Sequence, residues 1–591
     1  MKPLHAPLIA LALLCGSAPA ALSAQTDTPT APAPTSADLK LRALYDAEWT
    51  WRQQELARVA EGDRWEATDD HFPSVSAASQ ARRLAYWDKA LATLDTIPLD
   101  QLSPEEKINA AVFRTSVWAM ADNIRYKTYE APFNSDTFFW GGLNPRTPFQ
   151  TVDQYRRYLG RMKDLPRYFD EQIANMRAGI KRGYTVPRSS IEGRDKTMEP
   201  YVKGDLTNPF YETFAQIPAT LPAADQAALK AEAETVIRDT VAPAYVKLLA
   251  FMRTEYMPKA RKTTDAYSLP NGKAFYQARI EEFTTLTLTP EEIHEIGLKE
   301  VARIDADMQA TMKASGFKGS FPEFLTFLRT DPQFYAKTPR ELLSFSAYVT
   351  KRFDGKLKNV IGTLPRYRFT ILPVPDAIAP IYTSGRGGLD SCLMNTYDLP
   401  SRPLYNLTAL TLHECNPGHS FQAAVALEAP DRPAFRRQTY FSGYGEGWGL
   451  YTEWLGTITG MYDTPYEEFG RETFEMWRAV RLVIDTGLHA KGWSRQKAID
   501  YLAGHTALAQ RDVESEVDRY IAWPGQALAY KLGEITIRRL RKQAESELGA
   551  AFDQRPFHDA ILGLGSVPLP VLEERIGQFI ADEKAKAAAK R

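Results

Sequence analysis

The stretch that decides the fold class is residues 289–308, TPEEIHEIGLKEVARIDADM, which contains a helix start followed by an amphipathic repeat. Thr289 can cap a helix, Pro290 suits the first helical position, and Glu292 completes a capping box with Thr289. The apolar residues that follow lie near one stripe, as an amphipathic helix requires: Ile293, Ile296, Val301, Ile304 and Met308. The stretch therefore predicts a helix with one face toward a core.

The same three- and four-residue apolar spacing continues over most of the chain from about Leu39, and alternating strand-like runs are few. Pro524 can begin another helix, which would run toward Ile537. The best strand candidates are residues 368–374 and 391–397, which could pair with each other. We therefore predict a mainly α fold, a large helical protein with one small β element.

The chain has 591 residues, too many for one hydrophobic core, so we expect two or more packed lobes. A basic stretch, MPKARKTTD, marks a boundary near residue 262. It divides the folded part into an N-terminal helical lobe, residues 39–262, and a second helical lobe, residues 263–591. Lys plus Arg number 72 and Asp plus Glu number 73, so the chain has no basic excess that would favour nucleic acid as a partner.

The N-terminus has the pattern of an export signal, which we assign to residues 1–24. Lys2 precedes a short apolar run at residues 8–14, and cleavage is expected after Ala20 or Ala24. The apolar run is shorter than the roughly 20 residues that span a bilayer. We therefore expect no integral membrane segment after signal cleavage.

Residues 25–38, QTDTPTAPAPTSAD, predict a disordered linker behind the signal. We predict a periplasmic or secreted protein. A lipoprotein anchored at Cys15 is less favoured, because Leu14 stands where such signals prefer a small residue. The cysteines left after cleavage, Cys392 and Cys415, could pair in an oxidising compartment, but two buried free thiols are the favoured interpretation.

The stretch LHECNPGH contains two of the eight histidines of the chain, with a glutamate beside the first. A zinc hydrolase needs two neutral imidazoles, a third protein ligand and an open position for water. It also needs a carboxylate that accepts a proton from that water. His413 and Glu414 supply one ligand and one base side by side. The small β element is expected beside the helix that carries this motif.

The second histidine of the motif does not follow the common HExxH spacing, in which it would fall at Pro417. His419 lies six residues after His413, about 600° around an ideal helix, and would point away from it. Pro417 removes a backbone donor and Gly418 permits unusual dihedrals. Together they could break or bulge the helix and bring His419 back toward His413.

A third ligand is expected from a second helix, SGYGEGWGLYTE, at residues 442–453. Glu446 and Glu453 are seven residues apart, so their carboxylates share a face about two turns apart. One can bind metal while the other accepts a hydrogen bond from a ligating histidine. We expect four glycines to let this segment approach the first helix closely: Gly443, Gly445, Gly447 and Gly449.

These motifs resemble a known family. HECNPGHSFQ resembles the HExxPGHH-type signature of the bacterial domain-of-unknown-function family eight-eight-five, and EGWGLYTEWL resembles its EGWA-type block. Further similar blocks between about residues 265 and 535 are LPNGKAFY, TLTLTPEEIHEIGLKEV, RLVIDTGLH and RYIAWPGQALAYKLGE. The resemblance implies a mostly helical, clam-like zinc peptidase with a deep central cleft, related to gluzincins.

The resemblance also implies roles for the motif residues. His413, His419 and Glu446 would be the ligands of one zinc ion per chain, and Glu414 would be the general base. Ser420 departs from the pattern, because many relatives carry a second consecutive histidine at this position.

Other candidates lie near the motifs. For the group that stabilises the oxyanion of peptide hydrolysis, Tyr530 is the first choice, His489 the second, and Tyr520 a further candidate. Gln526 is four residues before Tyr530 and should face the same way. Gln526 is also a candidate for substrate binding. Arg478 and Arg481 could hold a peptide carboxylate. Asn395 lies in a segment that could bind an extended peptide as an edge strand does.

The sequence thus predicts a zinc-dependent metallopeptidase that hydrolyses peptides or oligopeptides, with Glu414 as general base. One alternative is a zinc amidohydrolase acting on non-peptide amides. The other is a non-catalytic periplasmic peptide-binding protein in which Pro417 has spoiled the ligand geometry.

Overall fold

The computed structural model describes residues 34–589, except residues 62–63, 136, 146–147, 377 and 430–431. The predicted signal, residues 1–24, lies outside the described residues. Helix α1 (Ser36–Glu55) already begins at Ser36, and Thr35 caps it. The predicted linker of residues 25–38 is therefore too long at its C-terminal end.

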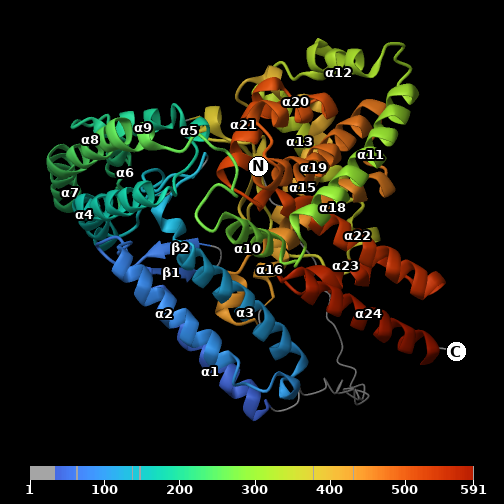
Figure 1. Cartoon of the computed structure of the whole chain (residues 1–591), viewed down its shortest axis with the longest axis horizontal. Coiled ribbons are helices and arrows are strands. Elements are labelled where there is room, and N and C mark those ends of the chain that lie inside the picture. Colours follow the sequence, from blue (N-terminus) through green and yellow to red (C-terminus); the bar gives the residue numbers. More distant parts are fainter. Residues whose placement is uncertain are drawn as a thin grey trace, which may run out of the picture.

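The fold is mainly α, as predicted (Figure 1). The N-terminal region contains three long helices, α1, α2 and α3, and one antiparallel hairpin. The bounds of the elements that follow α1 are β1 (Arg58–Glu61), β2 (Arg64–Ala67), α2 (Ala77–Leu94) and α3 (Pro104–Arg125). The apolar faces of these three helices share one core with helices from the C-terminal third of the chain.

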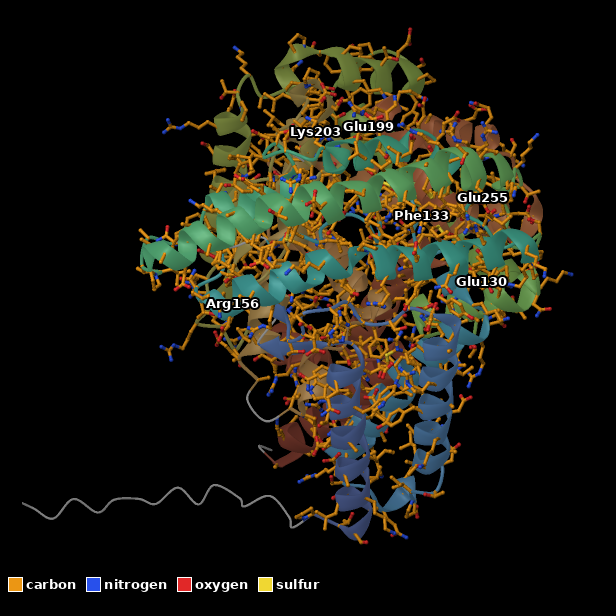
Figure 2. The ribbon with its side chains drawn as sticks, turned by 90° about the vertical axis from the view of Figure 1, so that its left-hand side faces the viewer. Glu130, Phe133, Arg156, Glu199, Lys203 and Glu255 are labelled. Carbon is orange, nitrogen blue, oxygen red and sulfur yellow. A yellow bond between two sulfur atoms is a disulfide. The ribbon has the colours of Figure 1, made fainter. Side chains whose placement is uncertain are left out.

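A second group of helices has a core of its own, built between Phe133 and Ala260. Its helices are α4 (Val152–Arg182), α5 (Arg188–Ile191), α6 (Glu212–Ala215), α7 (Ala223–Val236), α8 (Ala242–Phe251) and α9 (Met257–Lys259). Figure 2 shows this group from its side, with Phe133 buried within it and Arg156, Glu199 and Lys203 labelled. The core ends close to the predicted boundary near residue 262.

The remaining helices form the larger part of the molecule (Figure 1). They are α10 (Gly272–Thr284), α11 (Pro290–Ala314), α12 (Phe321–Thr330), α13 (Pro339–Asp354), α14 (Leu357–Val360), α15 (Leu407–Glu414), α16 (His419–Leu427), α17 (Ala434–Arg437), α18 (Ser442–Ile458), α19 (Pro465–Lys491), α20 (Arg495–His505), α21 (Gln510–Ala522), α22 (Ala529–Leu548), α23 (Gln554–Leu562) and α24 (Leu569–Ala589). Helix α19 packs against α11, and α18 packs against α22.

The predicted helix start at Thr289 is confirmed. Helix α11 begins at Pro290; the Thr289 hydroxyl accepts from the Glu292 backbone N–H at 3.2 Å, and Glu292 accepts from the Thr289 N–H at 2.8 Å. The other predicted start is wrong by two residues. Gly525 has a φ of +83°, a left-handed conformation that prevents a helix from beginning at Pro524. A 3₁₀ turn, Gln526–Leu528, leads directly into α22, which starts at Ala529.

The two predicted strand segments pair, as expected. Strands β3 (Thr370–Pro373) and β5 (Ser391–Met394) are parallel, with Thr370 opposite Ser391. A short strand that the sequence did not predict, β4 (Gly385–Arg386), pairs antiparallel with β5. The order is therefore β3-β5-β4, with β4 at one edge. Helix α15, which carries His413, contacts β4, so the β element lies beside the motif helix.

A disulfide joins Cys392 in β5 to Cys415, the residue that follows Glu414. The favoured interpretation of two free thiols is therefore wrong. The two cysteines are far apart in sequence, and only the packing of β5 beside the end of α15 brings them together. Both side chains are fully buried, so the link anchors the motif helix to the small sheet.

None of the described helices is long and apolar enough to cross a membrane. The clam-like shape, the deep central cleft and the division into two lobes at residue 262 stay predictions. Helices α1, α2 and α3 share one core with helices from the C-terminal third of the chain. A division at residue 262 would cut through this core.

We expect removal of the disulfide to lower stability without changing the fold. The bond closes a loop with a sequence separation of 23 residues, and cross-links of this size stabilise by about 3 kcal/mol. A Cys392→Ser/Cys415→Ser variant should therefore unfold at a lower denaturant concentration than the oxidised parent. An unchanged midpoint, with thiol titration proving the parent oxidised, would contradict this expectation.

Candidate metal centre

The motif residues lie where one helix ends and another begins. Helix α15 ends at Glu414 and α16 starts at His419, so the helix breaks across residues 415–418. A Cβ atom on Gly418 would lie 1.8 Å from the carbonyl oxygen of His413, so only glycine allows the chain to turn back this closely. The prediction that this segment breaks the helix is confirmed.

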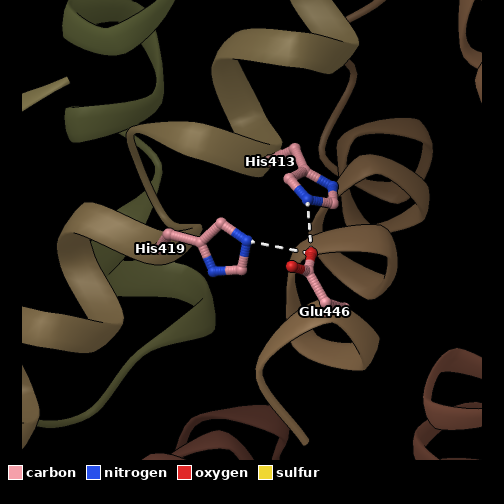
Figure 3. A group of neighbouring side chains, drawn as sticks. All are labelled: His413, His419 and Glu446. Carbon is pink, nitrogen blue, oxygen red and sulfur yellow. Dashed lines mark hydrogen bonds and ion pairs between the residues drawn. The ribbon is translucent and has the colours of Figure 1, made fainter. Parts of the chain in front are cut away.

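The break brings three predicted ligands together (Figure 3). The donor atoms of His413, His419 and Glu446 all lie within 4.8 Å of one another. Glu446 Oε2 is 3.4 Å from Nε2 of His413 and 3.2 Å from Nε2 of His419. The two imidazole rings, with centroids 4.9 Å apart, thus face one carboxylate oxygen.

Glu446 lies on α18, which passes close to the His413 ring at Gly449. A Cβ on Gly449 would be 2.7 Å from two atoms of the His413 imidazole, so this glycine makes room for the ring. The expectation that all four glycines face the motif helix is wrong. Gly443 faces Thr284 at the end of α10, Gly447 faces Gly533 of α22, and Gly445 faces Tyr440.

Charge pairing dominates the centre. Burial alone would lower the pKa of His413, but hydrogen bonds to Glu446 and Glu453 and the nearby charge of Glu414 raise it to about 9. Burial would raise the pKa of Glu446, yet the two histidines hold it well below its usual value. The His413 ring therefore favours its protonated form beside these carboxylates.

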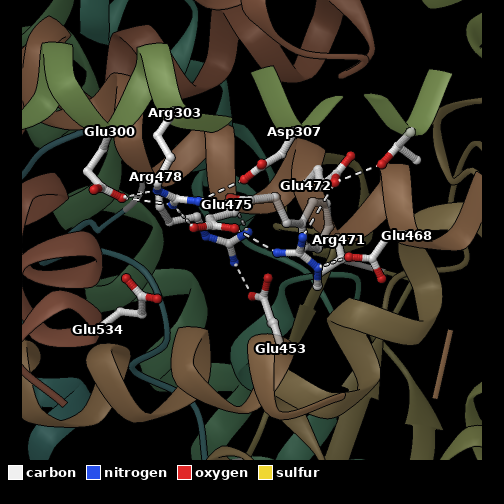
Figure 4. Close-up of polar contacts among 12 residues, drawn as sticks. Glu300, Arg303, Asp307, Glu453, Glu468, Arg471, Glu472, Glu475, Arg478 and Glu534 are labelled. Atoms are coloured by element: carbon white, nitrogen blue, oxygen red, sulfur yellow. Dashed lines mark hydrogen bonds and ion pairs between the residues drawn. The ribbon is translucent and has the colours of Figure 1, made fainter. Parts of the chain in front are cut away.

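Glu453 is the partner of His413, as predicted. It is buried, and its Oε1 accepts a hydrogen bond from Nδ1 of His413 at 2.7 Å. Arg478 Nη2 lies 3.3 Å from the same oxygen, and the Arg478 side chain is only 4% exposed (Figure 4). The prediction that Arg478 binds a substrate carboxylate is therefore corrected: Arg478 is paired with Glu453 inside the protein.

Glu414 is held by the edge strand. The backbone N–H of Gly387, directly after β4, donates to Glu414 Oε2 at 2.7 Å. A Cβ on Gly387 would lie 2.0 Å from the Glu414 carbonyl oxygen, so this close approach requires glycine. The Ser420 hydroxyl accepts from the N–H of Gly388 at 3.1 Å, which gives the serine at this position a structural role.

His489 is not part of the group, and the prediction of a catalytic role is corrected. Its Nδ1 accepts from the Ala266 N–H at 3.1 Å, and its Nε2 donates to the Tyr520 carbonyl at 3.0 Å. Burial lowers its pKa to about 4, so the ring stays neutral. Tyr520 is also committed elsewhere, because its hydroxyl accepts from Trp477 Nε1 at 2.8 Å and from Arg481 Nε at 3.0 Å.

Tyr530 and Gln526 face the same way, as predicted, and Arg519 lies between them. Arg519 Nη2 is 3.3 Å from Gln526 Oε1 and 3.5 Å from the Tyr530 hydroxyl. The Arg481 guanidinium lies over the Tyr530 ring at 4.3 Å and is ion-paired with Glu516 at 2.9 Å. Arg481 is buried, so its predicted role in binding a substrate carboxylate gains no support.

Asn395 is corrected too. Its amide donates to three backbone carbonyls, those of Ala379, Tyr382 and Thr383, and so fixes the loop before β4. The strand that precedes it, β5, is central in the sheet, so it has no free edge for a peptide. The edge next to Glu414 belongs to β4.

Two residues that the sequence did not single out stand near the centre. Arg386 in β4 is exposed and interacts electrostatically with Glu414 and Tyr440. Tyr440, just before α18, interacts in the same way with Glu446, Glu414 and Tyr530. The sequence signals were the glycine-rich TSGRGGLD, which contains Arg386, and the position of Tyr440 six residues before Glu446.

The structure so far defines a class: a mainly α protein with a His/His/Glu group at a helix break and a glutamate beside it. The chain belongs to the family described as "Bacterial protein of unknown function (DUF885)", whose model matches residues 57–576. This confirms the family resemblance. No curated protein matches the chain.

Solved structures match the fold over nearly the whole chain. One is the crystal structure of "the putative lipoprotein from Colwellia psychrerythraea", with 27% identity, a TM-score of 0.84, and coverage of 93% of this chain and 100% of that chain. Another is "a putative lipoprotein of unknown function from Shewanella oneidensis", with 17% identity, a TM-score of 0.68, and coverage of 91% and 99%.

We expect Glu453→Gln to weaken binding of a divalent metal ion. The amide keeps the shape of the side chain but removes the negative charge that orients His413. Loss of such a partner typically costs about 10- to 100-fold in metal affinity. Competition with a chromophoric chelator measures the change, and Glu545→Gln, at an exposed position on α22, is the matched control. Equal affinities for parent and Glu453→Gln would refute this role.

Metal binding should also release protons near neutral pH. The pKa of His413 is about 9 in the metal-free chain, so a cation that binds at pH 7.5 displaces the proton from this ring. Affinity should therefore rise with pH up to about 9 and then level off. Calorimetry in two buffers of different ionisation enthalpy counts the protons; no net release at pH 7.5 would be the contrary result.

Proposed function

We propose that the protein is a zinc-dependent metallopeptidase that hydrolyses peptides or oligopeptides. The observation that carries the proposal is the convergence of His413, His419 and Glu446, whose donor atoms lie within 4.8 Å of one another. The helix break that achieves this argues against the alternative in which Pro417 spoils the ligand geometry.

The residues fit zinc by the chemistry of their donor set. Two imidazole nitrogens and one carboxylate oxygen are the ligands of many catalytic zinc sites, which keep a fourth position for water. When bound, zinc supplies Lewis acidity that lowers the pKa of water and polarises a carbonyl. Glu453, hydrogen-bonded to Nδ1 of His413, fixes which nitrogen of that ring faces the centre.

Glu414 is the proposed general base. Glu414 directly follows the proposed ligand His413 but is not itself one of the proposed ligands. The Gly387 N–H donates to its Oε2 and so fixes the orientation of the carboxylate. In this role Glu414 accepts a proton from the attacking water and passes it to the leaving amine. The β4 edge beside it offers backbone groups that an extended peptide could pair with.

We also propose that the protein is exported. The N-terminal signal pattern and the solved neighbours described as putative lipoproteins both support this location. The Cys392–Cys415 disulfide supports it as well, because such bonds persist in oxidising compartments.

The test combines metal content with turnover. We expect natively purified protein to contain about one zinc per chain, by analogy with catalytic sites of this ligand set, and His413→Ala/His419→Ala to lose it. Glu414→Gln should keep the metal but lose about 10²- to 10⁴-fold of the peptide-hydrolysing activity, because it cannot accept the proton.

Glu428→Gln, at the end of α16, is the matched control because its carboxylate binds only backbone away from the ligands. Full activity in Glu414→Gln would refute the general base. Zinc in the parent with hydrolysis of non-peptide amides alone would favour the amidohydrolase. A parent that takes up no metal when zinc is supplied would favour the peptide-binding protein.

A further inference from the structure

Among the tyrosines near the centre, only some have hydroxyl groups that can serve a substrate. Tyr520 is committed to Trp477 and Arg481. Tyr530 is only 7% exposed, and its hydroxyl lies near Arg519. Tyr440 differs from both. It is 56% exposed, and within the described part of the chain its hydroxyl has no hydrogen-bond partner.

Tyr440 also has the right position. A Cβ atom on Gly445 would lie 2.3 Å from the Tyr440 hydroxyl oxygen, so the phenol rests on the α18 backbone directly before Glu446. Its electrostatic partners include Glu446, Glu414 and Arg386, three groups that surround the centre from α18, α15 and β4. An exposed donor therefore lies against the residue that directly precedes the ligand carboxylate.

The protonation state of Tyr440 suits a donor. A tyrosine hydroxyl in water has a pKa of about 10, well above neutral pH. The hydroxyl therefore carries its proton throughout the neutral range and can donate it in a hydrogen bond.

We propose that Tyr440 is a catalytic residue whose hydroxyl donates a hydrogen bond to the carbonyl oxygen of the scissile peptide bond as that oxygen becomes negative. This inference rests on the proposed peptidase function. No bond to Tyr440 forms or breaks, and the phenol keeps its proton. A donor already placed at the developing charge costs no reorganisation during the reaction, which is why such donors contribute strongly.

The first variant is Tyr440→Phe, which removes the hydroxyl and keeps the ring. We expect kcat to fall about 10²- to 10³-fold, the usual effect of losing one oxyanion donor, with KM and zinc content unchanged. Affinity for a phosphinic peptide that mimics the tetrahedral state should fall by a similar factor, whereas affinity for a product peptide should not. Tyr348→Phe, at an exposed position on α13, is the matched control and should leave kcat unchanged.

A second variant tests the position of the hydroxyl. Gly445→Ala places a Cβ where the phenol end of Tyr440 now lies, and an exposed side chain can rotate away without unfolding the protein. We expect this variant to lose kcat much as Tyr440→Phe does. The double variant should lose no more than either single variant, because both remove the same interaction.

The outcomes separate the two proposals. Wild-type activity in Tyr440→Phe, or an effect on KM alone, overturns the role of Tyr440 while the peptidase stands. Additive losses in the double variant also overturn it. Absence of Glu414-dependent peptide hydrolysis in the zinc-loaded parent overturns the peptidase function and this inference with it.

Discussion

The structure depends on charges that are buried and paired along α19. Arg478 joins Glu453, which holds His413 from behind. Three residues earlier on α19, Glu475 contacts Arg471 of the same helix and Arg303 of α11 (Figure 4). Glu475 also contacts Lys531 of α22. An unpaired buried charge is strongly destabilising, so these helices cannot separate or shift without a large cost. The candidate metal centre is thus attached to helices that are joined by buried ion pairs.

A second constraint acts from the other side of the motif. The helix break leaves Glu414 at the very end of α15, where a helix terminus could fray. Three contacts prevent this: the Gly387 N–H on its carboxylate, the Gly388 N–H on Ser420, and the disulfide from Cys415 to β5. The small sheet therefore serves mainly to position the end of one helix. This gives the β3-β5-β4 sheet a clear role in a mainly helical protein.

Local signals in the sequence were sufficient for part of the fold and the site. The capping box at Thr289 involves residues three apart, and the spacing of Glu446 and Glu453 follows from helix geometry, so both could be read directly. The partners that a side chain finds in the folded protein could not be predicted from the sequence. Arg478 and His489 have the chemistry of site residues, but Glu453 and the Ala266 and Tyr520 backbones occupy them. Tyr440 was missed for the converse reason, because its importance comes only from packing on Gly445.

The contact of one carboxylate oxygen of Glu446 with both imidazoles has a consequence for how the helices are joined. Glu446 Oε2 lies 3.4 Å from Nε2 of His413 at the end of α15 and 3.2 Å from Nε2 of His419 at the start of α16. One side chain of α18 therefore bridges the two helices on either side of the break. A substitution at Glu446 would loosen all three helices at once.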